Sequence, residues 1–177
     1  MERRIGKRTR KIEVRDDRLY TLDVFIISGP IAQEFAKKNR VISRTIQVRG
    51  HQSLHELHRA IFRAFDREEE HMYEFQIGGK GRHDPKARCY VLPMAMRDPF
   101  AEGKPAGDVT RTTIGSLGLK VGQAFGYWFD FGDDWWHQIN VVAIDDRVPS
   151  GKYPRVTKRV GKSPPQYADW DAGSDSA

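Results

Sequence analysis

The sequence has one cysteine, Cys89, in 177 residues. A single thiol cannot form an internal disulfide, and it excludes a zinc site built from several cysteines. No hydrophobic run approaches the ~20 residues of a transmembrane helix, and the mean hydropathy is −0.66. The N-terminal segment MERRIGKRTRK lacks the apolar stretch of a signal peptide. These absences predict a cytoplasmic protein with no membrane partner, in which Cys89 is a buried structural thiol.

Net positive charge is concentrated at the two ends of the chain, and the middle is close to neutral. The formal net charge is +6, of which residues 1–11 contribute +5 and residues 149–177 contribute +2, so residues 12–148 sum to −1. A basic arm binds phosphate groups without sequence preference, although such a segment is also typical of a solvated chain end. The candidate nucleic-acid-binding residues are Arg3, Arg4, Lys7, Arg8, Arg10 and Lys11.

Hydrophobic patterns predict an α+β fold in a single domain. Helical spacing of apolar residues predicts a short helix after Pro30 that ends near Asn39, and a second helix over 53–65. Apolar alternation and β-branched residues predict strands at 19–28, 41–48, 72–77, 88–92, 123–131 and 135–144. Because strands and helices do not alternate regularly, we expect a mainly antiparallel sheet with two helices packed on one side and a C-terminal aromatic β-hairpin. The predicted units are a basic arm (1–17), the domain (18–167) and an acidic, disordered tail (168–177), with loop structure after residue 149.

The helix over 53–65 has the clearest local signals. Ser53 and Glu56 match a capping box, in which the serine oxygen accepts a free backbone amide and the glutamate reaches back to the cap. Apolar residues on one stripe predict the buried face, and they are Leu54, Leu57, Ile61, Ala64 and Phe65.

The register of the aromatic hairpin has two alternatives. A three-residue loop at 132–134 would place Phe131 opposite Trp135 and Phe129 opposite His137, with the aromatic side chains on one face. A two-residue turn at 133–134 would instead place Asp130 opposite His137 and mix polar with apolar residues on both faces. We predict the first register, in which His137 packs among aromatic rings and makes no direct hydrogen bond to Asp130.

Two segments resemble the plasmid pRiA4b ORF-3-like family: LHRAIFRAFDREEEHMYEF (57–75) and FGYWFDFGDDWWHQI (125–139). The resemblance covers roughly residues 19–167 and implies a mobile-element setting, since family members occur on plasmids and in insertion sequences. Many relatives end in a cysteine-containing tail, where this chain has GKSPPQY. The letters PPQY also match the form bound by WW domains, but we expect Tyr167 to hold this segment back against the domain.

Two other short motifs give no support for an activity. The letters DFG at 130–132 occur without the remaining kinase signatures. GGKGR at 78–82 lacks the phosphate-loop pattern and favours a turn between strands.

Histidines and carboxylates provide the remaining candidates for chemistry. The candidate functional cluster consists of His58, His71, Glu74, Asp130, Asp133, Trp135 and His137. Nitrogen and oxygen donors of these types bind zinc, manganese or iron, and the metal candidates are His58, His71 and His137. Their spacing matches no standard metal motif. We therefore expect no cofactor and a noncatalytic binding or accessory domain, associated with plasmid or transposable-element DNA. The alternative is a metal-dependent, hydrolase-like enzyme that uses His58, His71, Asp130, Asp133 and His137.

Overall fold

A computed structural model describes residues 15–98 and 103–167. The candidate arm residues and the predicted acidic tail lie outside the described residues. Within them, eight strands form one sheet in the order β5-β4-β3-β6-β7-β1-β2-β8, and every neighbouring pair except β4 and β5 is antiparallel. The predicted α+β fold with a mainly antiparallel sheet is confirmed.

The elements of the fold, in chain order, are β1 (Leu19–Ser28), α1 (Gln33–Lys38), β2 (Ser43–Arg49), α2 (Leu54–Ala64), β3 (Tyr73–Ile77), β4 (Arg88–Val91), the 3₁₀ turn η1 (Ala95–Arg97), β5 (Gly107–Asp108), the 3₁₀ turn η2 (Gly115–Leu117), β6 (Ala124–Phe129), β7 (Trp135–Asp145) and β8 (Arg155–Val160).

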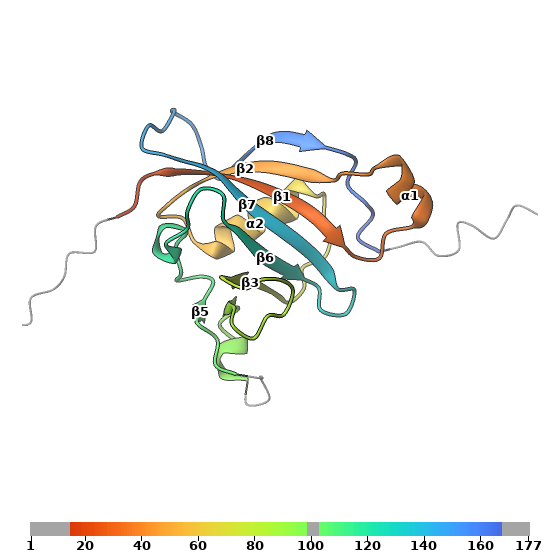
Figure 1. Ribbon diagram of the computed structural model, residues 1–177, viewed down its shortest axis with the longest axis horizontal. Helices are drawn as coiled ribbons and strands as arrows, with labels where there is room; N and C mark the ends of the chain where they lie inside the picture. Colours follow the sequence, from red (N-terminus) through yellow and green to blue (C-terminus); the bar gives the residue numbers. More distant parts are fainter. Residues whose placement is uncertain (1–14, 99–102, 168–177) are drawn as a thin grey trace, which may run out of the picture.

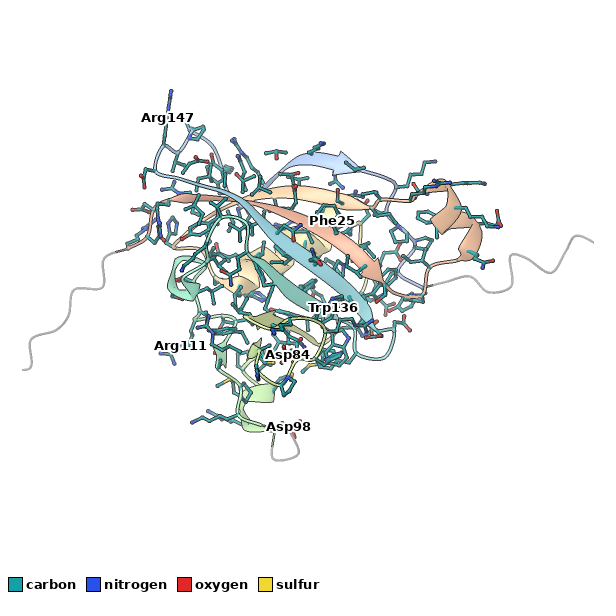
Figure 2. All side chains as sticks on the ribbon, in the orientation of Figure 1. Phe25, Asp84, Asp98, Arg111, Trp136 and Arg147 are labelled. Carbon is teal, nitrogen blue, oxygen red and sulfur yellow. The ribbon has the colours of Figure 1, made fainter. Side chains whose placement is uncertain are left out.

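The sheet has one covered face and one open face. Helix α2 lies behind the sheet in Figure 1, and α1 lies beside the ends of β1 and β2. Alternation along β1 buries Tyr20, Leu22 and Val24 completely against the core, as expected for a strand with one buried side. Phe25 belongs to the opposite set and is half-buried on the face turned to the reader in Figure 2. Trp136 of β7 lies on the same face and is buried. The core therefore lies between the sheet and α2.

The cap and the buried face of α2 are as predicted. The Ser53 side chain accepts a hydrogen bond from the Glu56 amide, and the Glu56 carboxylate accepts one from the Ser53 amide. Leu57 is fully buried. The segment before η2 supplies further acceptors, since the amides of Leu54 and His55 donate to the carbonyls of Thr112 and Val109.

The predicted hairpin register is wrong by two residues. Phe129 lies opposite Trp135 and Tyr127 lies opposite His137, so the loop is five residues long, from 130 to 134. Asp130 closes it: this residue has a positive φ of 55°, its carbonyl accepts from the Asp134 amide, and its carboxylate accepts from the Asp133 amide. Aspartate tolerates this conformation and bonds its own loop. A register shift of two residues leaves each side chain on the same face of the sheet. The predicted division between the two faces therefore holds, but Phe131 lies in the loop and does not pair with Trp135.

The prediction of loop structure after residue 149 is also wrong, because β8 pairs with β2 at the edge of the sheet. Arg44 of β2 joins the two. Its guanidinium is almost completely buried and donates to the carbonyls of Ala64, Val160 and Gly161 and to the Ser163 hydroxyl. The Ala64 carbonyl is at the C-terminal end of α2, where carbonyls lack a partner within the helix. One side chain therefore connects the helix, β8 and the segment that follows it.

Two adjacent tryptophans on β7 pack on opposite faces of the sheet, each against a glycine. An added Cβ would lie 2.3 Å from the Trp135 ring at Gly29 and 2.5 Å from the Trp136 ring at Gly126. Neither position has room for a side chain. Gly126 in the middle of β6 is therefore explained by the indole of Trp136, which lies flat on the open face.

Candidate functional site

The structure distributes the predicted cluster over separate places. His58 lies in the core beneath α2, His137 and Trp135 lie in the core beside Arg67, and His71 lies near Asp130 at the hairpin loop. Asp133 is part of that loop and donates its amide to Asp130. Glu74 is on β3 between the buried residues Tyr73 and Phe75, so its side chain belongs to the open face.

His58 is the centre of a buried hydrogen-bonded chain. Its Nδ1 lies 2.7 Å from the Tyr127 hydroxyl and its Nε2 lies 2.8 Å from a Glu70 carboxylate oxygen. Since a carboxylate only accepts, Nε2 carries the proton and donates, and Nδ1 accepts from Tyr127. The Tyr73 ring stacks on the imidazole at 3.7 Å between centroids, with 1° between the planes. Burial lowers the His58 pKa to about 4 despite Glu70, and burial raises the pKa of Tyr127. The chain is neutral at its buried centre, and its Glu70 end is exposed.

His71 takes part in the contact that holds the C-terminal segment. The Tyr167 hydroxyl donates to a Glu69 carboxylate oxygen at 2.8 Å and lies 2.8 Å from Nε2 of His71. An Asp130 oxygen lies 3.5 Å from the same nitrogen. The buried Gln166 accepts from the amides of residues 68 and 69 and donates to the Glu69 carbonyl. The expectation that Tyr167 holds PPQY against the domain is confirmed.

Arg67, just beyond α2, was not among the sequence candidates. It is 8% exposed, and its guanidinium carbon lies 3.6 Å from the centroid of the Trp135 ring. Burial lowers its pKa to about 10. His137 donates from Nδ1 to the Tyr127 carbonyl at 3.3 Å, and burial, followed by Arg67, lowers the His137 pKa to about 3. His137 is packed among aromatic rings as predicted, and no hydrogen bond joins it to Asp130 among residues 15–98 and 103–167.

The described residues do not gather into a metal-ligand set. In that part of the chain, no group of three His, Cys, Asp or Glu side chains is placed to hold an ion. His58, His71 and His137 each have a hydrogen-bond partner of their own. Aromatic rings stand between them, since Tyr127 contacts His58 and His137, and Phe129 contacts His58 and His71.

A groove of about 820 Å³ crosses the open face over β6, β3 and β4. This volume lies in the range of small-ligand and peptide sites. Its floor includes Trp128, Glu74 and Gln76, since Glu74 lies opposite Trp128 on one neighbouring strand and opposite Val91 on the other. One wall is the 78–87 loop with His83 and Asp84. At one end Phe131, which lies in the hairpin loop, stacks on Trp128 with 4.0 Å between ring centroids.

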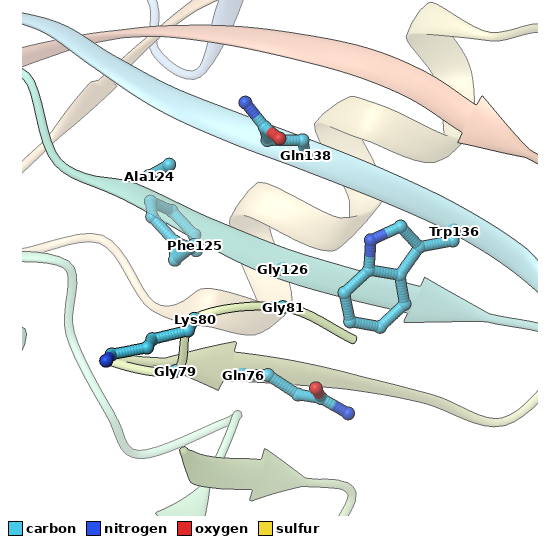
Figure 3. Close-up of a pocket in the computed structure, with 9 residues that line it drawn as sticks. All are labelled: Gln76, Gly79, Lys80, Gly81, Ala124, Phe125, Gly126, Trp136 and Gln138. Carbon is cyan, nitrogen blue, oxygen red and sulfur yellow. The ribbon is translucent and has the colours of Figure 1, made fainter. Parts of the chain in front are cut away.

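The 78–87 loop is fixed to the sheet and separates the groove from a smaller hollow. The Gln76 side chain accepts from the His83 amide at 2.9 Å and approaches the His83 ring at 3.3 Å. On the other side of this contact lies a hollow of about 100 Å³, bounded by Lys80, Gln138 and Trp136 (Figure 3). The Lys80 amide donates to Asp84 within the loop, so GGKGR forms part of a long connection between β3 and β4.

Cys89 and His83 both line the groove. Cys89 lines it and is half-buried, which corrects the prediction of a buried thiol. Burial, followed by the Glu74 charge, raises the pKa of Cys89 to about 11, so the thiol stays protonated and weakly nucleophilic near neutral pH. The histidine in the groove, His83, packs edge-on against Trp128 at 4.3 Å.

Sequence reasoning missed Arg67, Tyr127 and His83. Arg67 stands before a run of three glutamates, so a local count of charge gives an acidic loop. Tyr127 was counted as one aromatic of the hairpin, although a tyrosine on a buried face needs a partner for its hydroxyl. That rule predicts a partner for the Tyr127 hydroxyl, and only the structure identifies it as His58.

Three comparisons place the chain among known proteins. No curated protein matches it significantly. The crystal structure of a protein of unknown function, MM3350 from Methanosarcina mazei Go1, superposes with a TM-score of 0.62 at 23% identity, covering 85% of this chain and 73% of that one. This likeness shows a shared fold. In the described residues, no helix is both long enough and apolar enough to span a bilayer. The model of the plasmid pRiA4b ORF-3-like family matches residues 32–170, and the chain therefore belongs to the plasmid pRiA4b ORF-3-like family.

Proposed function

We propose that this protein is a noncatalytic binding domain whose ligand occupies the groove on the open face over β6, β3 and β4. One contrast supports the proposal. The groove is a large concave surface lined by Trp128 and Phe131, whereas His58, His137 and Tyr127 are each at most 1% exposed. A general acid or base must come within hydrogen-bond reach of a substrate, and these three groups are buried in the core.

The enzyme alternative needs His58, His71, Asp130, Asp133 and His137 around one ion. In the described part of the chain these side chains do not form a set of metal ligands, which does not favour it. Elemental analysis of untagged protein would favour the enzyme instead if it found stoichiometric metal and if that metal were bound by those residues.

The groove proposal is tested by NMR on the ¹⁵N-labelled full chain, titrated with a pool of random heptapeptides. We expect shifts at the Trp128 indole and the Gln76 side-chain amide, and none at the Gln166 amide on the C-terminal segment. The variant Ala106→Trp fills the groove and should abolish the shifts, and Val142→Trp, at an exposed position on β7 outside the groove, should keep them. Shifts that persist in Ala106→Trp would contradict the proposal.

A second binding function, to plasmid or transposable-element DNA, is supported by the +5 charge of residues 1–11 against a body near neutrality. Because each phosphate contact on duplex DNA releases about 0.9 counterion, affinity through this arm should fall steeply with salt. Deleting residues 1–11 should remove most duplex affinity and leave the melting temperature unchanged. A truncated protein that binds as well as the full chain at matched salt would move the site to the body. A cytoplasmic location is part of this proposal.

A further inference from the structure

The groove carries an uncompensated negative charge on its floor. The carboxylate of Glu74 accepts a hydrogen bond from the neutral amide of Gln76, and within residues 15–98 and 103–167 it forms no ion pair. The charge also acts on its surroundings, since it contributes to the raised pKa of Cys89 across the β3–β4 pair. A half-buried carboxylate without a cation is a recognition element for a positively charged ligand.

The other charged residues that line the groove do not cancel the charge of Glu74. Asp84 and Asp98 line it on the acidic side, and Arg88 and Lys104 line it on the basic side. Asp84 accepts from the amides of Lys80 and Lys86, and the Arg88 guanidinium donates to the Leu117 carbonyl at 3.3 Å. With Glu74 included, the lining residues in the described part of the chain have three carboxylates and two cations. This balance disfavours a phosphate backbone in the groove.

An aromatic surface stands beside this carboxylate. Trp128 lies opposite Glu74 in the β3–β6 ladder, so the two side chains are neighbours on the open face. Phe131 stacks on Trp128 and is 38% exposed. A ring face attracts ammonium and guanidinium groups through its quadrupole. The five-residue hairpin loop thus places an exposed ring in the same groove as the Glu74 carboxylate.

We propose that the groove binds an extended peptide segment through a lysine or arginine side chain, whose cationic group contacts the Glu74 carboxylate and the Phe131 ring. The inference rests on the proposed binding function and names its ligand class. The volume of the groove, about 820 Å³, leaves room for flanking peptide residues, and the acidic balance selects a basic peptide over nucleic acid.

The test uses NMR of the ¹⁵N-labelled full chain with N-acetyl-arginine amide and N-acetyl-lysine amide as probes. N-acetyl-citrulline amide is the control, because it has nearly the shape of the arginine probe and no charge. The cationic probes should shift the Trp128 indole and bind at least about fivefold more tightly than citrulline. Glu74→Gln should remove this preference, and Glu74→Asp should retain part of it. Glu34→Gln, which removes one exposed carboxylate on α1, should bind as the wild type does.

The outcomes separate this inference from the proposed function. If citrulline shifts the groove as strongly as arginine does, or if Glu74→Gln keeps the preference, the cation inference is overturned and the groove remains a binding site. Equal losses in Glu74→Gln and Glu34→Gln would show unspecific attraction and would also overturn it. If neither these probes nor the heptapeptide pool shifts any groove resonance, both proposals fail.

Discussion

Replacing Arg44 by methionine should lower the free energy of unfolding by about 3 kcal/mol or more. The substitution keeps much of the aliphatic volume and removes the donors that serve the carbonyls of Ala64, Val160 and Gly161. A buried acceptor left without a partner costs about 1–3 kcal/mol. The Val160 and Gly161 carbonyls lose their donor together, whereas the Ala64 carbonyl keeps a hydrogen bond from Arg159. Urea denaturation followed by far-ultraviolet circular dichroism measures the change.

Arg59→Met provides the matched control for this prediction. Arg59 is on the exposed side of α2, so the same change of residue type should stay within about 0.5 kcal/mol of the wild type. Hydrogen exchange should also show β8 losing protection in Arg44→Met, since Arg44 holds the edge strand. A stability equal to that of Arg59→Met would mean that water replaces the guanidinium at little cost.

Leu57→Ala should cost about 2–5 kcal/mol of unfolding free energy, because the side chain is fully buried beneath α2 and its removal leaves a cavity. Ser53→Ala should cost less, about 1 kcal/mol, the usual loss of an N-cap oxygen. The capping box is present, so the Ser53 cap and the buried Leu57 side chain both stabilise α2. Paired denaturation curves give the ranking, and a larger loss at Ser53 would show that the cap, rather than packing, dominates the stability of α2.

Structure that depends on near neighbours was predictable from the sequence. Ser53 and Glu56 are three residues apart, so the cap of α2 is decided within one turn. Leu19–Ser28 was predicted with the bounds that β1 has. The sorting of the hairpin faces followed from period-two alternation, and it survived the wrong register because the error was an even number of residues.

Features that need a distant partner were not predictable. The hairpin loop closes at Asp130, whose amide donates to the Met72 carbonyl of a segment far away in the chain. β8 has little apolar alternation, and it becomes a strand because β2 offers unpaired backbone groups at the sheet edge. The histidines and carboxylates were counted as one cluster because they share chemistry, and the tertiary structure separates them.

The sequence by itself determined the helices, the faces of the strands and the family, because periodicity, capping and segment likeness are properties of contiguous residues. Only the tertiary structure decided which polar groups are exposed. It buried His58 and His137 against aromatic rings and left Glu74 open beside Trp128. The physical reason is that burial of a side chain depends on the strands and loops packed around it, and these come from residues far apart in the chain.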